Sequence, residues 1–180
     1  MDINQIQAIF IDRDGTIGGT DEAIYPCNFE VFPFVRKSLS LLKQNKNLIF
    51  SFTNQPGISK GEAKISDFEQ ELLSFGFDKI YLCPHQHGEG CSCRKPLPGM
   101  LEKAASDNNL DLSKCVVIGD RWTDLVAANE VGAIKILVRT GAGERELNKF
   151  NNNEFYGKWA VVRPDYIAKD LEDAINWLLE

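Results

Sequence analysis

The chemistry of this sequence begins at Asp12 and Asp14, two carboxylates that directly follow the apolar run 8–11. In an extended chain, side chains two positions apart point to the same side. Two like charges held this close repel each other unless a cation or a proton shares the site. Gly15 follows and lets the backbone turn sharply. The spacing predicts a charged site at the end of a buried strand, although a solvated loop after a strand accounts for an isolated pair of aspartates equally well.

Two further apolar runs end in polar residues of the kind that bind phosphate or metal. The run 48–52 leads into Thr53 and Asn54, and the run 115–119 leads into Asp120. In an open sheet of parallel strands, ligands bind beyond the carboxyl ends of the strands, where the strand order reverses. We therefore expect these side chains to meet the aspartate pair at one edge of a sheet. Taken singly, each of them could also serve a turn or a helix N-terminus.

Such a set of residues suits the transfer of a phosphoryl group. Carboxylates alone repel phosphate, but Asp12 and Asp120 on neighbouring strands would share Mg2+, a hard cation that prefers oxygen ligands. The hydroxyl of Thr53 and the ammonium of Lys95 would then face the phosphate oxygens. One carboxylate would attack phosphorus to form an aspartyl-phosphate, and another would protonate the leaving oxygen.

A second cluster of chemically active residues lies between positions 83 and 93. Cys83, Cys91 and Cys93, with either His85 or His87, offer the thiolates and the imidazole that suit tetrahedral Zn2+. Four protein ligands leave no open position for water, so such a zinc ion would be structural. The one-residue gaps differ from the spacing of common zinc fingers, and a loop with free thiols is the alternative.

Helical and strand patterns alternate along the chain. Strands are expected at 8–11, 48–53, 79–82, 115–120, 134–138 and, weakly, 159–162; helices are expected near 33–42, 63–75, 98–108, 123–130 and 167–179, with loops at 17–28 and 139–143 and an exposed turn at 151–153. Each connection is long enough for a crossover. The order predicts an α/β fold, an open parallel sheet with helices on both faces.

Length and composition limit the classes of function. With 180 residues, the chain is expected to form one domain over 1–180. Its net charge of -6 argues against a nucleic-acid scaffold or an anionic membrane surface. The N-terminus lacks a leader pattern, and no apolar run approaches the roughly 20 residues of a membrane helix. We expect a monomer in the cytoplasm that binds neither nucleic acid nor membrane and acts on a small phosphorylated metabolite.

In order along the chain, the motifs resemble those of a known superfamily. The four motifs of haloacid dehalogenase superfamily phosphatases are similar to Asp12-Arg13-Asp14-Gly15-Thr16, Thr53-Asn54-Gln55, Lys95 and Gly119-Asp120-Arg121-Trp122-Thr123-Asp124. With the Cys-Pro-His and Cys-Ser-Cys-Arg-Lys-Pro segments, the chain resembles the narrower family of D-glycero-D-manno-heptose 1,7-bisphosphate 7-phosphatases and histidinol-phosphate phosphatases. The resemblance implies a Rossmann-like sheet with a minimal cap and a small zinc-binding loop.

The resemblance implies a role for each motif residue. Asp12 would be the nucleophile, and Asp14 would protonate the leaving alcohol and then activate water as a base. Thr53 and Lys95 would bind the phosphoryl group. Substrate binding would involve three further polar side chains, Asn54, Arg94 and Arg121.

The resemblance also implies how Mg2+ is held. Its ligands would be Asp12, the backbone carbonyl of Asp14, and Asp120, with Asp124 in a supporting role. The activity would be a Mg2+-dependent phosphomonoesterase acting on a small sugar phosphate, most simply one like heptose 1,7-bisphosphate.

For zinc, the resemblance favours His85 over His87, so that the ligands would be Cys83, His85, Cys91 and Cys93. The loop 83–93 runs directly into Arg94 and Lys95. Zinc would therefore serve catalysis by fixing the backbone that carries these two cations.

Three alternatives stay open at this point. Histidinol phosphate is the alternative substrate, because the segments around the metal loop and the first loop depart from the heptose enzymes where specificity would be set. A phospho-accepting receiver domain also uses aspartates, a threonine and a lysine at a sheet edge, and a zinc-bearing nucleic-acid module is a third possibility that the acidic charge disfavours.

Several residues near the motifs have structural interpretations. Trp122 is expected to be buried beneath the following helix rather than to line the pocket, and Thr123 is expected to cap that helix. The loop 139–143 is either a plain strand exit or a contact to substrate. Cys27 and Cys115 are interpreted as ordinary buried thiols.

Overall fold

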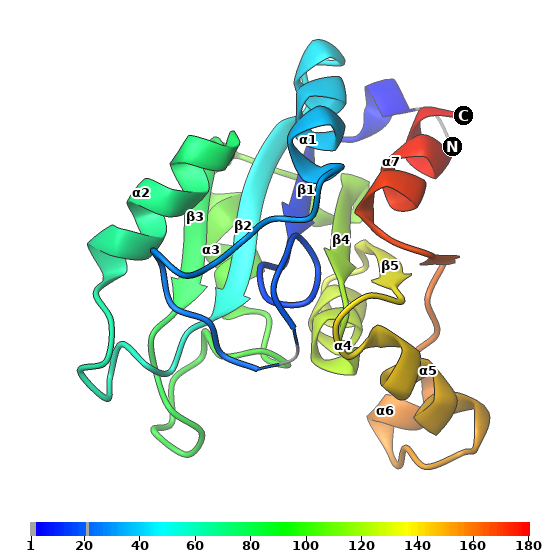
Figure 1. Ribbon diagram of the computed structural model, residues 1–180. Coiled ribbons are helices and arrows are strands. Elements are labelled where there is room, and N and C mark those ends of the chain that lie inside the picture. Colours follow the sequence, from blue (N-terminus) through cyan, green and yellow to red (C-terminus); the bar gives the residue numbers. More distant parts are fainter. Residues whose placement is uncertain (1–2, 21) are drawn as a thin grey trace.

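The computed structural model describes residues 3–20 and 22–180. Its centre is a six-stranded, all-parallel sheet in the order β3-β2-β1-β4-β5-β6 (Figure 1). The strands are β1 Ala8–Ile11, β2 Leu48–Asn54, β3 Lys79–Cys83, β4 Cys115–Gly119, β5 Ile134–Val138 and β6 Tyr166–Ala168. In register, Phe10 of β1 lies between Phe50 of β2 and Val117 of β4. The chain reverses its direction of travel across the sheet between β1 and β4, which is where ligands bind in folds of this order.

Helices cover both faces of the sheet. They are α1 Val35–Gln44, α2 Ile65–Phe75, α3 Gly99–Asn108, α4 Trp122–Glu130, α5 Gly143–Asn151, α6 Lys158–Val161 and α7 Leu171–Leu179, with short 3-10 turns at Ile3–Gln5 and Leu112–Lys114. The predicted open parallel sheet with helices on both faces is confirmed.

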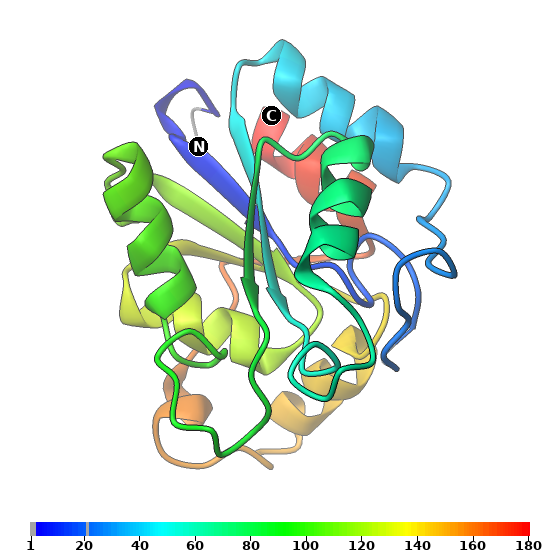
Figure 2. The same ribbon diagram turned by 90° about the vertical axis from the view of Figure 1, so that its left-hand side faces the viewer.

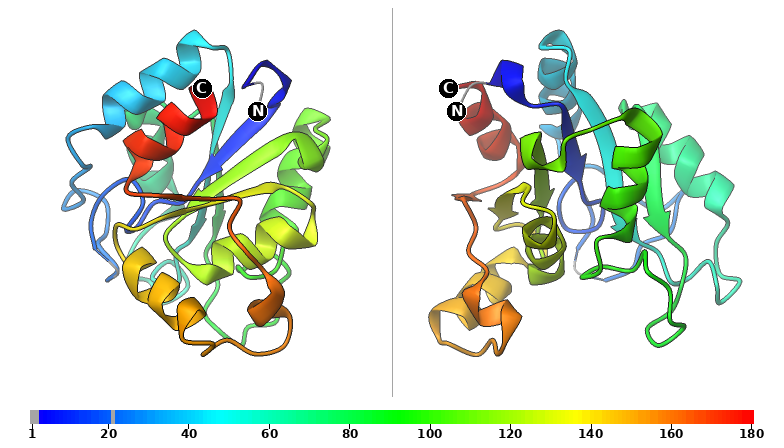
Figure 3. Two further views of the ribbon diagram at one scale, coloured as in Figure 1. Left: turned by 90° about the vertical axis from the view of Figure 1, so that its right-hand side faces the viewer. Right: turned by 180° about the vertical axis from the view of Figure 1, so that it is seen from behind.

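Side chains along β1 point alternately to the two faces of the sheet. Both faces are covered by helices, so the side chains on both are apolar. Ile9 and Ile11 pack in one core with α1, α2 and α7, whereas Ala8 and Phe10 pack in a second core with α3 and α4. All four residues of β1 are buried. Figures 2 and 3 show α1 and α7 side by side on one face and α3 and α4 on the other. A strand covered on both faces is held rigidly, so the residue that follows it has a fixed position.

The C-terminal part of the sheet differs from the prediction. The predicted strand 159–162 is wrong, because residues 159–161 belong to α6, Val162 after it lies in no strand, and Val161 is 73% exposed. The sixth strand is β6, which pairs with β5 through Ile136 and Tyr166. The last helix consequently begins at Leu171 rather than at residue 167. A short apolar run does not by itself distinguish a strand from a helix.

The predicted loop 139–143 leads directly into α5, a helix that the sequence interpretation lacked. Within α5, only Gly143 and Glu146 are buried, and most of its residues are polar or charged, so the segment has few apolar residues to reveal it as a core helix. Asn151 is the last residue of α5, and the predicted exposed turn is confirmed for Asn152 and Asn153.

Helix starts also differ in detail from the predictions. Thr123 does not cap α4: the helix begins at Trp122, and the Asp124 carboxylate accepts a hydrogen bond from the backbone N–H of Arg121 at 3.0 Å. The first helix begins at Val35, two residues after Pro33. Among the described residues, no helix combines the length and the apolar character needed to cross a membrane.

Candidate active site

A cleft of about 620 Å³ lies at the carboxyl ends of the central strands. The predicted residues from four separate stretches of sequence meet there. The lining includes Asp12, Asp14, Thr53, Asn54, Arg94, Lys95 and Arg121. Residues from the segments between the strands complete it, among them Glu22, Tyr25, Gln55, Lys60, His87 and Trp159. Asp120 and Asp124 are fully buried next to Asp12.

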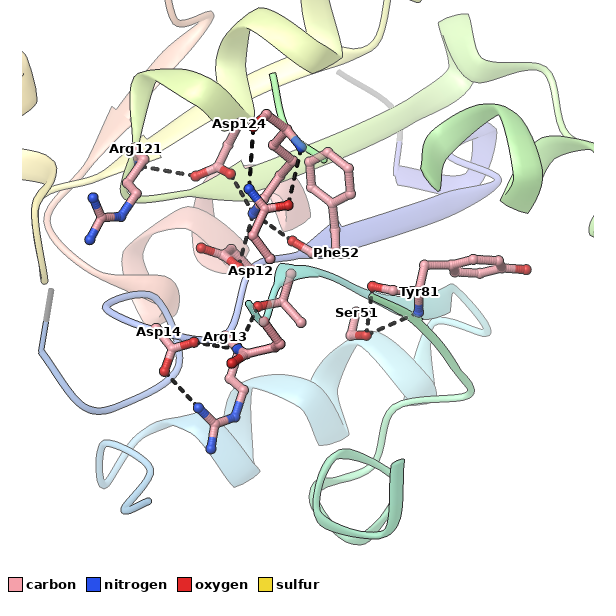
Figure 4. A network of polar contacts seen from close by, with 12 residues as sticks. Asp12, Arg13, Asp14, Ser51, Phe52, Tyr81, Arg121 and Asp124 are labelled. Atoms are coloured by element: carbon pink, nitrogen blue, oxygen red, sulfur yellow. Dashed lines mark hydrogen bonds and ion pairs between the residues drawn. The ribbon is translucent and has the colours of Figure 1, made fainter. Parts of the chain in front are cut away.

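The ammonium of Lys95 is surrounded by acceptors. It lies 3.0 Å from Asp12 Oδ1 and 2.6 Å from Asp124 Oδ1, and it donates to the backbone carbonyl of Phe52 at 2.7 Å. Burial alone would lower the pKa of Lys95, but the two carboxylates outweigh it and raise that pKa above its ordinary value. The lysine therefore stays charged and balances part of the negative charge around Asp12. Figure 4 shows Asp12 and Asp124 in this network.

Asp120 is held through one carboxylate oxygen only. Oδ2 accepts a hydrogen bond from the backbone N–H of Ala142 at 2.7 Å, while the buried Oδ1 has no protein partner. Two glycines make room for this arrangement: a Cβ on Gly15 or Gly141 would lie 2.1 or 2.3 Å from Asp120 Oδ2. Desolvation, reinforced by the charges of Asp12 and Asp124, raises the pKa of Asp120 to about 8. A bound cation would stabilise the ionised form of a carboxylate that is buried beside other carboxylates.

The carboxylates of Asp12, Asp120 and Asp124 offer oxygen atoms within 4.8 Å of one another. Oxygen-only donors, an unpartnered buried oxygen and crowded negative charge are what a hard divalent cation such as Mg2+ requires. Asp124 also has a raised pKa, to about 6, because desolvation outweighs the lowering effect of Lys95. The donor set therefore fits Mg2+.

Asp14 lies outside this carboxylate group and has a different environment. Its Oδ2 accepts from Gln55 Nε2 at 2.6 Å, and its Oδ1 accepts from Arg13 Nη1 at 2.6 Å (Figure 4). Desolvation raises its pKa to about 6, although the Arg13 guanidinium opposes the shift. A carboxyl group that titrates near neutral pH is suited to giving and taking protons.

Asn54 and Thr53 organise the cleft from the end of β2. The amide of Asn54 bonds both sides of the Lys95 backbone: Oδ1 accepts from the Lys95 N–H at 3.1 Å, and Nδ2 donates to the Lys95 carbonyl at 3.3 Å. Asn54 therefore fixes the residue that carries the ammonium. The Thr53 hydroxyl accepts from Gln55 Nε2 at 3.0 Å and leaves its own hydrogen for another acceptor.

The predicted zinc ligands converge on one point. The Cys83 sulfur lies 3.6 Å from Cys91 Sγ, 3.2 Å from Cys93 Sγ and 3.5 Å from His85 Nδ1, and His85 Nδ1 lies 3.3 Å from Cys93 Sγ. Tetrahedral zinc with ordinary bond lengths would separate two sulfurs by about 3.8 Å and a sulfur from a nitrogen by about 3.5 Å. Desolvation raises the pKa of the Cys83 thiol, which a bound cation would reverse. The donor set fits Zn2+, with His85 in the cluster and His87 at the cleft.

The cysteine and histidine loop is tied directly to the cleft. Arg94 follows Cys93 and donates from Nη1 to the backbone carbonyl of His85 at 2.9 Å. The loop therefore sets the direction of Arg94 as well as the backbone of Lys95. Arg121 reaches the same cleft from the N-terminus of α4.

The remaining expectations have clear outcomes. Trp122 is fully buried, as predicted, and its ring stacks on Phe150 and Phe155 with centroid distances of 4.8 and 4.9 Å. In the 139–143 loop, the backbone N–H of Ala142 donates a hydrogen bond to Asp120. Cys115 is buried as predicted, but the same prediction for Cys27 is wrong, because that thiol is exposed.

Two residues that contact Asp14 had no role in the sequence interpretation. Gln55 belongs to the motif Thr53-Asn54-Gln55, but the motif did not indicate that the Gln55 side chain would reach back to Asp14 from the position just after β2. Arg13 is fully buried between two aspartates, and a charged residue inside a buried segment implies an acidic partner. That partner is Glu71, which is 58 residues away in the sequence. The sequence therefore indicated that Arg13 needs an acidic partner, but not which residue it is.

Comparison with known proteins agrees with this geometry. The model of the HAD-hydrolase-like family matches residues 92–174. D-glycero-beta-D-manno-heptose-1,7-bisphosphate 7-phosphatase from Haemophilus ducreyi is 35% identical over 153 residues, which cover 75% of this chain and 84% of that protein. This chain belongs to the haloacid dehalogenase-type phosphatases. Such enzymes are phosphoric monoester hydrolases.

Two other relatives extend the similarity over nearly the whole chain. The D-glycero-D-manno-heptose-1,7-bisphosphate 7-phosphatase of Thermosynechococcus vestitus is 32% identical, and the alignment covers 95% of this chain and 94% of that protein. The D,D-heptose 1,7-bisphosphate phosphatase of B. bronchiseptica, solved with magnesium and phosphate, superposes with a TM-score of 0.82 at 28% identity, covering 97% of this phosphatase and 98% of that chain. The receiver-domain and nucleic-acid alternatives are therefore set aside in favour of a phosphatase.

Proposed function

We propose that this phosphatase removes a phosphate from a small sugar phosphate similar to heptose 1,7-bisphosphate, with Asp12 as the nucleophile. The observation that carries the proposal is the pairing of two carboxyl groups at one cleft. Asp12 lies next to a lysine and two further buried carboxylates, whereas Asp14 lies between neutral and cationic donors. The lysine ammonium beside Asp12 suits a carboxylate nucleophile, and the raised pKa of Asp14, about 6, suits a group that exchanges protons.

In the first half of the reaction, a carboxylate oxygen of Asp12 attacks phosphorus. The bond from phosphorus to the sugar oxygen breaks, and the proton on Asp14 passes to that oxygen, which leaves as an alcohol. The Thr53 hydroxyl, whose hydrogen has no acceptor in Gln55, would donate to a phosphoryl oxygen, and the Lys95 ammonium beside Asp12 would supply positive charge where negative charge develops. The product on the enzyme is an aspartyl-phosphate on Asp12.

In the second half, water attacks the same phosphorus atom. Asp14, now ionised, takes the proton from this water, and the bond from phosphorus to the Asp12 oxygen breaks. Inorganic phosphate leaves, and Asp12 returns as a carboxylate while Asp14 regains its proton. Mg2+ held by Asp12 and Asp120, with the Asp14 carbonyl, and with Asp124 in support, would neutralise the charge of the phosphoryl group.

The cationic side chains of the cleft support a substrate with a second anionic group. Lys60, Arg94 and Arg121 line the cleft together with His87, in addition to the buried Lys95. The relatives are named for a sugar that carries two phosphates. We assign Arg94 and Arg121 to substrate binding on this basis, and Asn54 because its side chain lines the same cleft.

We further propose that Zn2+ at Cys83, His85, Cys91 and Cys93 is structural. All four positions of a tetrahedral ion would be taken by the protein, so no open position remains for water. The ion would hold the loop from which Arg94 and Lys95 extend. The single domain over 1–180, the monomeric state and the cytoplasmic location remain predictions, of which size-exclusion chromatography with light scattering tests the second.

A phosphate-release screen tests the proposed function. The purified protein is given Mg2+ and either heptose 1,7-bisphosphate, histidinol phosphate or a range of other sugar phosphates. We expect the highest kcat/KM with the heptose bisphosphate. Preference for histidinol phosphate would overturn the substrate assignment, and release from no substrate would overturn the function. Mass spectrometry after acid quenching should find the transient phosphoryl group on Asp12.

A further inference from the structure

Arg13 is a fully buried cation whose donors are directed at specific acceptors. Its side chain is 0% exposed. Nε and Nη2 donate to the two carboxylate oxygens of Glu71 on α2, at 2.7 and 3.0 Å. Nη1 donates to Asp14 Oδ1 at 2.6 Å and to the backbone carbonyl of Ile24 at 2.8 Å. Burying a charge is unfavourable unless it is paired and hydrogen-bonded, so these contacts depend on one another.

Aromatic rings hold the guanidinium in its plane. The centre of the guanidinium lies 3.6 Å from the ring centroid of Phe29 and 5.0 Å from that of Phe68. A planar guanidinium can stack on rings while it makes a two-pronged contact with a carboxylate, which an ammonium cannot do. Arg13 thereby joins three segments: the end of β1, residues 22–29 and α2. Glu22, Ala23 and Tyr25 of the second segment line the cleft.

As a result, both oxygens of the Asp14 carboxyl group accept hydrogen bonds from the protein. Arg13 occupies a lone pair of Oδ1, and Gln55 occupies a lone pair of Oδ2. Each oxygen keeps a further lone pair, so the group can still carry a proton. The two contacts fix the plane of the carboxyl group. The side chain is 18% exposed and lines the cleft, so its remaining lone pairs face the substrate space.

We propose that Arg13, anchored by Glu71, is a positioning residue that aims the carboxyl group of Asp14 at the leaving oxygen of the substrate. It also ties that carboxyl group to residues 22–29 at the wall of the cleft. The proposal rests on the proposed function, in which Asp14 protonates the leaving alcohol. Glu71 acts indirectly, because it positions the Arg13 guanidinium, and the guanidinium in turn positions the Asp14 carboxyl group.

This role predicts a dependence on the leaving group. A sugar alkoxide needs a proton as it leaves, whereas p-nitrophenolate leaves without one. Misplacing the acid should therefore harm hydrolysis of the C7 phosphate of heptose 1,7-bisphosphate far more than hydrolysis of p-nitrophenyl phosphate. The informative quantity is kcat/KM, because it covers only the steps through loss of the leaving group. Hydrolysis of the aspartyl-phosphate, which both substrates share, does not enter it.

The experiment measures kcat/KM with both substrates for the wild type and for Arg13→Met, Arg13→Lys, Glu71→Gln and Asp14→Asn. General acid catalysis contributes about 10² to 10⁴ in rate. We expect Arg13→Met to lower kcat/KM about 100-fold or more with the heptose bisphosphate and less than about 10-fold with p-nitrophenyl phosphate. Arg13→Lys should show the same selectivity, since an ammonium cannot reach Glu71 and Asp14 with the same geometry. Glu71→Gln should show it to a smaller extent.

Arg36→Met is the matched control. Arg36 also places its guanidinium over an aromatic ring of α2, that of Phe75 at 5.4 Å, and donates to the backbone of Ser74, but it is exposed and does not line the cleft. Both kcat/KM values should stay within about twofold of the wild type. Circular dichroism at the assay temperature identifies variants that remain folded, and Glu71→Gln keeps the test available if Arg13→Met does not fold.

The outcomes separate this proposal from the proposed function. If Asp14→Asn discriminates between the substrates while the folded Arg13 and Glu71 variants lose both activities equally or lose neither, the positioning role is overturned and the function stands. If Asp14→Asn itself does not discriminate, the acid assignment fails, and the role of Arg13 fails with it. A wild-type protein that hydrolyses neither substrate overturns the proposed function and the positioning role together.

Discussion

Removing the charge of Asp120 should stabilise the magnesium-free protein at neutral and alkaline pH. Asp120 is fully buried beside Asp12 and Asp124, and one of its oxygens has no protein partner. Desolvation and the neighbouring charges raise its pKa from 3.8 to about 8. The folded protein therefore binds this proton more tightly than the unfolded chain does. The resulting stabilisation is fully present below the unfolded pKa and is lost as the pH rises through the folded pKa.

The size of the effect follows from the two pKa values. At about 1.4 kcal/mol for each pH unit, the interval between 3.8 and about 8 corresponds to an upper limit of roughly 6 kcal/mol. Between about pH 5 and pH 8, a single group of this kind accounts for roughly 3 to 4 kcal/mol of lost stability. The raised pKa values of Asp14 and Asp124, each about 6, act in the same direction. The Asp120→Asn variant should lose the Asp120 part of this dependence and exceed the wild type in stability at pH 8.

Urea unfolding measured across this pH range tests the prediction. The buffer should contain neither Mg2+ nor a chelator, so that bound zinc stays in place. Asp67→Asn is the control, because Asp67 is an exposed aspartate in the first turn of α2 and its removal should leave the pH dependence unchanged. Adding Mg2+ at pH 8 should restore stability to the wild type, by about 2.7 kcal/mol at a concentration 100 times its Kd, and should restore less to Asp120→Asn. The reasoning is refuted if wild-type stability rises from pH 5 to pH 8, or if Asp120→Asn is the less stable protein at pH 8 without Mg2+.

Three other predictions concern the chemistry and its support. Asp12→Asn should abolish phosphate release while the far-ultraviolet circular dichroism stays unchanged; measurable turnover with no covalent phosphoryl group would contradict the nucleophile assignment. Cys91→Ser should lower the zinc content measured by elemental analysis and reduce kcat/KM at least about 10-fold while the sheet remains folded, and full activity in a protein shown to lack zinc would oppose the positioning role of that ion. Asn54→Ala removes two hydrogen bonds to the Lys95 backbone and should reduce stability in urea unfolding by about 1 to 3 kcal/mol together with kcat/KM, and Asn54→Asp, which places a carboxylate oxygen opposite the Lys95 carbonyl, should also be less stable than the wild type.

The sequence indicated which segments carry the residues of the site. Buried parallel strands are apolar on both faces, so the first polar residue after such a run marks the sheet edge, and this rule located Asp12, Thr53 and Asp120. The three cysteines and two histidines of residues 83–93 were visible as a cluster, because they lie within one short segment. Their spacing left His85 and His87 as alternatives, the resemblance favoured His85, and the structure brings His85 together with Cys83, Cys91 and Cys93.

Elements with weak apolar patterns were harder to predict. The charged helix α5 buries few residues, and the apolar residues around Trp159 join a cluster with Trp122 and Leu137 of β5 instead of forming a strand of the sheet. The pairing of β6 with β5 depends on tertiary packing. A run of three residues does not contain enough information to specify it.

Only the tertiary structure decided which atoms face each other. The ammonium of Lys95 lies between Asp12 and Asp124, the Ala142 N–H holds Asp120, and Glu71 reaches Arg13 from a helix on one face of the sheet. These partners are far apart in the sequence, and their contacts depend on strand register, loop path and helix packing together. The sequence by itself determined which functional groups this phosphatase possesses and at which edge of the sheet they lie. The different surroundings of its two aspartates came from the tertiary structure, because burial and hydrogen-bond partners influence the charge and direction of a carboxyl group, and neither is a local property of the chain.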